Sequence, residues 1–419
     1  MSVEPQVWPV LDDAAMHGPL GEWVALAAGY TEADPAAVLA TGLVATGVAA
    51  GNLSYMRAGN ARQAASLFAL IVADTPKANR GLSWAIVREL VIAIDPHLGA
   101  TRTLGGLGSG RGVIDALVGP PPHGVERTGP PPFPGANDRL LVIEPGFVRA
   151  LATAAKPTSS LQMLIRNAWS GERLEVAGRG RKAIADRHHI GVVAHATLDQ
   201  LGSSLSLTNA AASLINRFLF VLARRQGAIV DEGNVPTELT RDFASLISKN
   251  LAKSRSAGQL QRTPDADELW RDAYARLAED DPGGLLGIAL ARGSRHAMRL
   301  SLVYALCDGS PVVDVHHVQA GLAFWGYCRA SAELILAGRQ RDLAGELLAA
   351  LEAAGAAGLT LSEQIDYFGR NVPAERLKEA RRSLEAAGLV ASTRERRSPA
   401  GRPATITRAI RIQRGAIPG

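Results

Sequence analysis

The feature that most constrains the fold is a series of short apolar segments, each followed by turn-forming residues and a helical pattern. Residues 66–72, SLFALIV, form the first segment, and the polar loop ADTPKANRGLSW at 73–84 leads from it into a helix. RLLVIE at 139–144, IGVVAHAT at 190–197 and RFLFVLARR from Arg217 repeat the pattern. Buried parallel strands have this unbroken apolar character, so the alternation with helices favours an open parallel α/β sheet.

Helical patterns lie on both sides of this α/β region along the chain. Residues 20–51 predict two apolar helices with a break at Thr31, where Glu32 and Asp34 lie in an N-capping neighbourhood and Pro35 is suited to begin the second helix. Seven prolines within 120–134 predict a loop. From about 236 to 338 the periodicity is helical throughout, and four aromatic residues there are predicted to be core rather than base-stacking side chains: Trp270, Tyr274, Trp325 and Tyr327.

Composition excludes two broad classes of protein. With 47% hydrophobic and 20% charged residues, the chain is predicted to fold rather than to be disordered. No apolar run approaches the roughly 20 residues that a membrane span needs, and the amino-terminal residues do not resemble a signal peptide. The two cysteines, Cys307 and Cys328, are too few for a disulfide framework. We therefore expect a cytoplasmic protein with no membrane partner.

Positive charge is concentrated near the carboxyl end of the chain. Between Arg376 and Arg414 there are eleven basic and three acidic residues, a net charge of +8, whereas the whole chain carries only +5. The remainder of the chain therefore has a net charge of −3. Such a concentration is typical of surfaces that contact phosphates.

The order of elements in the same stretch predicts a winged helix. A helix at about 341–354 is followed by a second at 361–369 and a third from Pro373 to Gly388, and two strand-like segments then flank the basic loop RERRSPAGRPA. Winged helices also serve as protein-docking modules, but the charge favours double-stranded DNA as the partner.

Basic side chains in this stretch are the candidate DNA contacts. The third helix is expected to bury Leu377, Ala380 and Leu384, which leaves Arg381 and Arg382 as its best candidates for the major groove. The wing would reach the DNA backbone or minor groove. The full candidate set is Arg376, Lys378, Arg381, Arg382, Arg394, Arg396, Arg397 and Arg402.

Several stretches, taken in order and spacing, carry a family resemblance. They are TEADPAAVL at 31–39, the loop at 73–84, GLGSGRGVI at 106–114, RLLVIEPGF at 139–147, HIGVVAHAT at 189–197, NRFLF at 216–220, RLSLVYALCDG and HHVQAGLAFWGYCRAS. The chain resembles the P-loop ATPase-like proteins of phages, plasmids and integrative elements in high-GC bacteria, which often accompany primase-polymerase domains.

The resemblance implies a RecA-like or AAA-like α/β core, ATP and Mg²⁺ as cofactors, and a homo-oligomer that binds nucleotide between neighbouring subunits. Together with the residue patterns it predicts an N-terminal helical region at 1–65, a P-loop-like core at 66–235, a helical subdomain at 236–340 and a winged-helix DNA-binding domain at 341–419.

The resemblance also assigns roles to individual residues. It implies a catalytic carboxylate at the end of the strand 139–144, a polar residue at the end of the strand 190–197, and an arginine finger that acts across a subunit interface. These roles fall on Glu144, His195 and Arg217, and the phosphate cradle falls on Lys77, Arg80, Gly81 and Ser83.

Departures from the family pattern predict weak or lost hydrolysis. Ala73 and Ala78 stand where glycines would let the backbone wrap a phosphate, and Pro145 stands where a second carboxylate would position the attacking water. Lys77 and Arg80 nevertheless retain positive charge for binding a nucleotide. Whether the chain is an ATPase is therefore left open by the sequence.

Histidine-rich stretches are not predicted to form a metal site. His188, His189 and His195 lie at a strand start and end with no carboxylate or cysteine at ligand spacing, so core or strand-end polar roles are expected. His316 and His317 precede a helix whose N-terminus needs hydrogen-bond partners, and capping accounts for them.

Three functional hypotheses follow. The first is a DNA-binding replication or maintenance protein of a mobile element, in which a degenerate ATPase core serves as an oligomeric scaffold. The second is an active ATP-dependent helicase or translocase, and the third is a transcriptional regulator.

Overall fold

The computed structural model describes residues 8–75, 81–119, 135–177, 182–204, 214–227, 235–368, 372, 374–396 and 403–410. These residues divide into two units, of which the first extends to Leu334 and the second begins at Ile335. The division falls within helix α14 (Val315–Ala354). The proline-rich loop predicted at 120–134 lies outside the described residues. Among the residues described, no helix is both long and apolar enough to cross a membrane.

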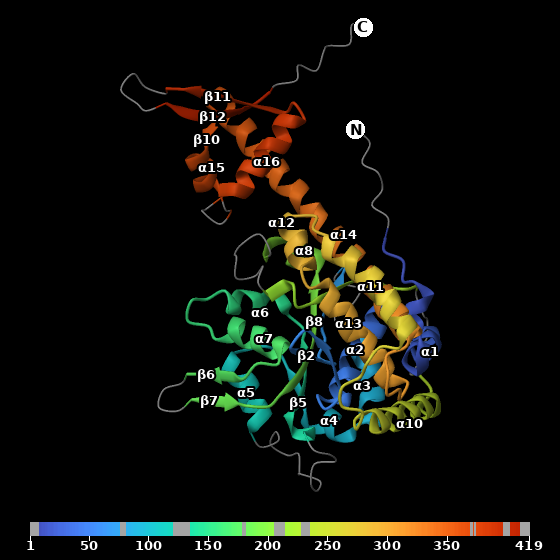
Figure 1. The fold of residues 1–419 in the computed structure, drawn as a ribbon. Helices are drawn as coiled ribbons and strands as arrows, with labels where there is room; N and C mark the ends of the chain where they lie inside the picture. The colour runs from blue at the N-terminus through green and yellow to red at the C-terminus, as the bar shows by residue number, and fades with distance from the viewer. Residues whose placement is uncertain are drawn as a thin grey trace. The chain divides into compact units, whose positions relative to one another are not determined.

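A five-stranded parallel sheet forms the centre of the first unit (Figure 1). Every neighbouring pair of its strands is parallel. Three of the strands are buried along their whole length, as their unbroken apolar runs predict. The predicted parallel α/β sheet is therefore confirmed. In spatial order the strands are β4 (Thr103–Gly105), β5 (Arg139–Glu144), β8 (His189–Thr197), β3 (Phe68–Ala73) and β9 (Leu219–Ala223).

Helices cover both faces of this sheet (Figure 1). Helix α2 (Pro35–Ala50) packs across β8, β9, β3 and β5, and α3 (Leu82–Ile94) packs against α2. The close approach of α2 depends on Gly191 in β8, where a Cβ would lie 2.4 Å from Cγ2 of Val48. The opposite face carries α5 (Gly110–Val118), α6 (Phe147–Ala154), α7 (Leu161–Ser170) and α8 (Leu198–Ser204), and α4 (Pro96–Thr101) follows α3.

Residues before the sheet form the predicted pair of helices. The 3₁₀ turn η1 (Asp13–Met16) leads into α1 (Gly18–Ala27), and a second turn, η2 (Ala28–Tyr30), separates α1 from α2. Asp34 caps α2, since its Oδ1 accepts the backbone N–H of Ala36 at 2.9 Å. Two short antiparallel hairpins complete this part: β1 (Tyr55–Ala58) with β2 (Ala61–Ala64), and β6 (Leu174–Val176) with β7 (Ala183–Ala185).

The helical region after the sheet belongs to the same unit. It comprises α10 (Thr237–Ser254), α11 (Pro264–Glu279), α12 (Gly284–Leu290), α13 (Gly293–Cys307) and the first part of α14. Helix α10 packs against α3 and α1, and α13 packs against α2, so the helices share a core with the N-terminal region and the sheet. Trp270, Trp325 and Tyr327 are buried as predicted. Tyr274 is not a core residue, because it is 51% exposed.

A buried ion pair joins the sheet to the helices. The Arg139 side chain, at the start of β5, is fully buried, and its Nη1 lies 2.6 Å from Oδ2 of Asp95. Arg139 also donates to the carbonyl oxygens of Ala136 at 3.1 Å and Ala49 at 2.9 Å. Asp95 in turn caps α4, since its Oδ1 accepts the backbone N–H of Leu98. The Asp95 carboxylate therefore both neutralises the buried Arg139 and caps the N-terminus of α4.

The second unit consists of three helices and a small antiparallel sheet. After the last part of α14 come β10 (Leu359–Thr360), α15 (Leu361–Tyr367), α16 (Ala374–Ala386), β11 (Val390–Glu395) and β12 (Ala404–Ala409), with β12 in the middle of the sheet. The helix predicted separately at 341–354 is thus continuous with α14. Gly388 ends the third helix as predicted, with a φ of +70°. The core contains Leu347, Leu351, Ala380, Leu384 and Val390.

Candidate functional site

The carboxyl ends of β3 and β8 form a topological switch point. The chain leaves β3 toward β4 on one side and leaves β8 toward β9 on the other, although β3 and β8 are direct neighbours. Ligands of open α/β sheets bind outside the carboxyl ends of the strands at such a point. The loop after β3 and the residues that end β5 and β8 therefore form the candidate ligand-binding region.

Two of the four predicted phosphate-cradle residues lie in the described part of the chain. Gly81 directly precedes α3 with a φ of +97°, a conformation that favours glycine. Ser83 is 5% exposed, and its hydroxyl accepts a hydrogen bond from the Thr41 hydroxyl of α2 at 3.2 Å. The predicted magnesium hydroxyl thus contacts a neighbouring helix. Lys77 and Arg80 lie outside the described residues.

Glu144 ends β5 at this edge of the sheet and is buried. Its Oε2 accepts the backbone N–H of Leu107 at 2.5 Å, and its Oε1 accepts the backbone N–H of Gly146 at 2.6 Å. Both carboxylate oxygens therefore hold neighbouring loops in place. The next residue is Pro145, which has no acidic group to position a water molecule.

His195 lies beside Glu144 on β8. The ring hydrogen-bonds to the backbone of Glu144, and burial lowers the pKa of His195 to about 4 despite this contact. The imidazole is therefore neutral at physiological pH. Its Nε2 is buried and has no hydrogen-bond partner among the residues that the structure describes.

The predicted arginine finger, Arg217, lies at a different edge of the sheet from Glu144. It precedes β9, whose Leu219 pairs with Ala69 near the start of β3, so Arg217 lies at the amino edge of the sheet. It is 4% exposed, and its Nη1 donates to Oδ1 of Asn216 at 2.8 Å. Burial, followed by the nearby charge of Arg292, lowers the pKa of Arg217 to about 10. Within one chain, the two predicted catalytic residues are therefore on opposite edges, and a finger role for Arg217 requires a neighbouring subunit.

The predicted buried face of α16 is confirmed in the second unit. Leu377 is fully buried, and Ala380 and Leu384 are 8% and 5% exposed. Arg382 is exposed, whereas Nε of Arg381 lies 3.6 Å from Oε1 of Glu385 on the same helix.

Two further predicted contacts on α16 are partly covered. Lys378 donates to Oε1 of Glu375 at 2.6 Å, and Arg376 is half-buried. Together with the pairing of Arg381, this leaves Arg382 as the most accessible predicted arginine of the helix.

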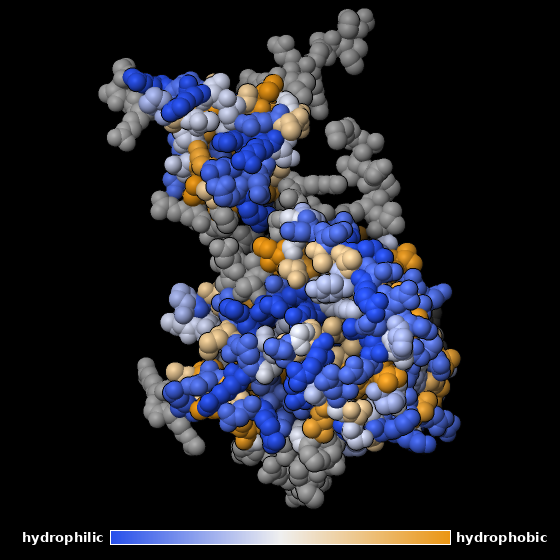
Figure 2. Space-filling model, in the orientation of Figure 1, coloured by the Kyte–Doolittle hydropathy of each residue, from blue (hydrophilic) through white to orange (hydrophobic). Residues whose placement is uncertain are grey.

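The hairpin of β11 and β12 presents a basic residue on the side that faces α16. Arg394 is exposed and shares a strand face with Ser392, because side chains alternate along a strand, and Arg396, also exposed, directly follows β11. Ser392 donates to Glu385 of α16 at 2.5 Å, which fixes that face toward the helix. Figure 2 shows hydrophilic residues gathered over α16 and the hairpin. Arg397 and Arg402 lie outside the described residues.

The histidines that follow one another near β8 do not form a cluster. Nε2 of His188 is 2.8 Å from the carbonyl oxygen of Glu172, and Nε2 of His189 is 2.9 Å from that of Gly47. Burial lowers the pKa of His189 to about 4. These are the structural roles that the sequence predicts.

A different histidine cluster, formed by His17, Asp308 and His317, is not predicted by the sequence. Oδ2 of Asp308 lies 2.7 Å from Nε2 of His17 and 3.0 Å from Nε2 of His317. Nδ1 of His317 accepts the backbone N–H of Asp314 at 2.9 Å, so the ring proton is on Nε2, where it donates to Asp308. A ring nitrogen that carries a proton cannot ligate a metal, so this cluster is a hydrogen-bonded bridge in this form. No sequence signal predicts it, because His17 and Asp308 are 291 residues apart.

Comparison with known proteins adds no assignment. No protein-family model matches the chain, and no curated protein is detectably similar to it in sequence. The functional interpretation therefore depends on the fold and on the chemistry of the residues described above.

Proposed function

We propose that the chain is a DNA-binding replication or maintenance protein of a mobile element. In this proposal the second unit is a winged helix that binds double-stranded DNA. The first unit is a degenerate RecA-like P-loop core that serves as a homo-oligomeric scaffold, with weak or no ATP hydrolysis.

One observation carries the DNA-binding part of the proposal. The stretch with a net charge of +8 lies within the second unit and includes most of α16 and the β11–β12 hairpin, and both elements carry exposed arginines. Arg382 comes from the third helix, Arg394 from the strand face directed toward that helix, and Arg396 directly follows that strand. A helix in the major groove with a wing along the backbone needs basic side chains on these two elements together.

The strand order supports a RecA-like core. The strand before the cradle loop, β3, lies inside the five-stranded sheet between β8 and β9, the last two strands of that sheet along the chain, as in RecA-like proteins. The local geometry around it supports weak hydrolysis. Glu144 already accepts two backbone hydrogen bonds, Pro145 replaces an acidic neighbour, and the Ser83 hydroxyl contacts Thr41.

Salt-dependent DNA binding tests the proposal. Fluorescence anisotropy with a labelled duplex would compare the full chain with the variant Arg382→Ala/Arg394→Ala/Arg396→Ala. Each lost phosphate contact lowers the slope of log K against log salt by about 0.9, so three contacts lower it by about 2.7. Between 50 and 200 mM salt, the parent chain should therefore lose about 40-fold more affinity than the variant.

A charge-matched control separates this surface from general electrostatics. Arg88, Arg149 and Arg173 are exposed arginines of the first unit, and their triple alanine variant changes the net charge by the same amount. The control should keep the parent slope. Equal slopes for the parent chain and the second-unit variant would exclude this surface from the DNA interface.

An ATP-dependent translocase is the second candidate, and the switch point between β3 and β8 favours it. Gly81 begins the helix after β3 in a left-handed conformation, as a phosphate-binding loop requires. DNA-stimulated ATP hydrolysis distinguishes the two candidates.

A further inference from the structure

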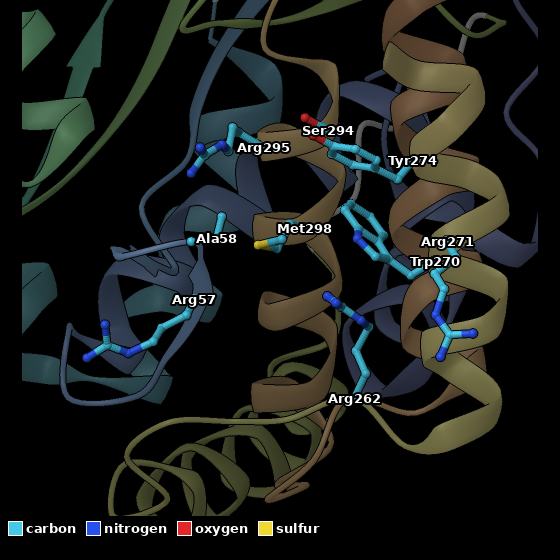
Figure 3. A pocket seen from close by; sticks show the side chains of 10 residues that line it. Arg57, Ala58, Arg262, Trp270, Arg271, Tyr274, Ser294, Arg295 and Met298 are labelled. Carbon is cyan, nitrogen blue, oxygen red and sulfur yellow. The ribbon is translucent and has the colours of Figure 1, made fainter. Parts of the chain in front are cut away.

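A cavity of about 500 Å³ in the first unit is lined by arginines and aromatic rings. It lies between the β1–β2 hairpin, helix α11 and the start of α13 (Figure 3). The sequence gives no hint of it, because the three segments are far apart along the chain. Its principal polar and aromatic residues are Arg57, Arg262, Trp270, Arg271, Tyr274 and Arg295.

Positive charge in this cavity exceeds the negative charge beside it. Asp267 neutralises part of it, since its carboxylate lies 2.9 Å from Nε of Arg262 and 3.0 Å from Nη2 of Arg271. Arg57 instead donates to two neutral groups, Oε1 of Gln259 at 3.1 Å and the carbonyl oxygen of Asn60 at 3.4 Å.

The fourth arginine adds to this excess. Arg295 is half-buried and has no ion-pair partner among the described residues. Four arginines thus line the cavity together with no acidic residue, and Asp267 beside it pairs with only two of them, so this wall attracts an anion.

The aromatic side chains differ in exposure. Trp270 is 6% exposed, and the guanidinium carbon of Arg262 lies 5.1 Å from its ring centre. Tyr274 is 51% exposed, and its ring centre is 6.3 Å from that of Trp270 at an interplanar angle of 44°. In Figure 3 the rings of Trp270 and Tyr274 extend from α11 toward α13, whose Ser294 and Met298 also line the cavity. An accessible ring with a fixed ring behind it is suited to stacking against a planar group.

A second hollow adjoins this cavity. It has a volume of about 310 Å³, shares Arg57, Arg262 and Arg271 with the cavity, and adds Gln259, Gln261 and Asp267. A ligand that alternates planar groups with anions along its length matches two adjoining hollows with shared arginines. A single small anion would use only one of them.

We propose that this arginine–aromatic cavity binds single-stranded nucleic acid, with a base stacked on Tyr274 and adjacent phosphates held by Arg57 and Arg295. Stacking on an aromatic ring beside a positively charged groove is how proteins bind single strands with little sequence preference. The site is independent of the duplex-binding surface proposed for the second unit, and a chain with both contacts would bind junctions of duplex and single strand.

Photocrosslinking locates the site without relying on affinity alone. The full chain would be irradiated with a 20-nucleotide oligothymidylate, digested and analysed by mass spectrometry. The proposal predicts nucleotide adducts on the peptides that contain Trp270 or Tyr274. Adducts confined to other parts of the chain would overturn it.

Matched variants then test the contacts. They are made in the Arg382→Ala/Arg394→Ala/Arg396→Ala background, so that the second unit contributes little. Tyr274→Ala should weaken oligothymidylate binding about tenfold, because stacking on one ring is worth roughly 1–3 kcal/mol per base. Arg57→Ala/Arg295→Ala should weaken it and flatten its salt dependence by about 1.4, from roughly 0.7 per contact. Tyr30→Ala, which removes another exposed tyrosine of the first unit, should have no effect.

Three further results test the proposal. In the parent background, Tyr274→Ala should leave duplex binding unchanged, which separates this proposal from that for the second unit. Equal oligothymidylate affinities for Tyr274→Ala and Tyr30→Ala would refute the stacking site. Displacement of the oligonucleotide by equimolar thymidine monophosphate would show a mononucleotide site and would overturn the proposal of an extended strand.

Discussion

Substitution of Asp95 tests the buried ion pair that joins β5 to the helices. Asp95→Asn keeps an oxygen that can cap α4 but removes the negative charge that faces the fully buried Arg139 and, at 3.8 Å, Nη2 of Arg255. Breaking a buried pair in this way typically costs about 3–5 kcal/mol, because the remaining charge is left uncompensated. Asp95→Ala also removes the cap and should cost roughly 1 kcal/mol more.

Tryptophan fluorescence during urea unfolding measures this loss in the correct unit. All six tryptophans precede Leu334, so the signal follows the first unit alone. Asp115→Asn is the matched control. The Asp115 side chain is 56% exposed and, among the described residues, its carboxylate pairs with Arg111 one helical turn away, so its loss should change stability by less than about 0.5 kcal/mol.

The pH dependence provides an independent check of the mechanism. Burial alone would raise the pKa of Asp95, but the charge and hydrogen bond of Arg139, the backbone N–H of Leu98 and the charge of Arg255 together lower it. The pair therefore stabilises the fold at pH values above the unfolded pKa of about 3.9, and this contribution is lost as the pH falls through the lower folded value. A loss below about 1 kcal/mol for Asp95→Asn at neutral pH, or a difference from the parent chain that persists in strong acid, would refute this reasoning.

Two further substitutions test other features of the fold. The hydrogen bond with Asp308 raises the pKa of His17 against burial, so the pair stabilises the first unit below about pH 6.5 and this contribution is lost as the pH rises through the folded value. His17→Gln should abolish that pH dependence in urea unfolding between pH 5.5 and 8.5, and an unchanged dependence would assign it to other groups. Gly358 has a φ of +60°, and a Cβ there would lie 2.5 Å from the carbonyl oxygen of Thr407. Gly358→Ala should therefore destabilise the second unit by more than about 1 kcal/mol, seen as faster hydrogen exchange in β12, and unchanged protection would contradict it.

Local signals in the sequence predict much of the fold. Unbroken apolar runs identify β3, β5, β8 and β9, because fully buried strands need no polar face. Asp34 with Pro35, and Gly388, mark helix ends by local backbone chemistry alone. The apolar residues of α16 recur at the helical period, and this spacing predicts the buried face of the helix.

Local signals do not predict contacts between segments that are far apart along the chain. His17 meets Asp308, and Arg57 meets the cavity that also contains Arg295, only because the fold brings remote elements together. Tyr274 shares a helix face with Trp270 at a spacing of four residues, yet it stays exposed because it borders a cavity.

The position of Arg217 is different, because the direction of the parallel strands can be predicted from the sequence. A residue that precedes a parallel strand lies at the amino edge of the sheet, away from the carboxyl edge where Glu144 lies. The family resemblance directs attention to the residue type, whereas strand direction decides which edge it occupies.

Steady-state ATP hydrolysis by the full chain, measured with and without duplex DNA, tests whether the core is a scaffold or a motor. A scaffold with a degenerate core should bind the duplex while turnover stays near the background rate and does not respond to DNA. Turnover that rises with DNA and disappears in Glu144→Gln would contradict it, because the carboxylate that holds the Leu107 and Gly146 backbones would then also serve catalysis.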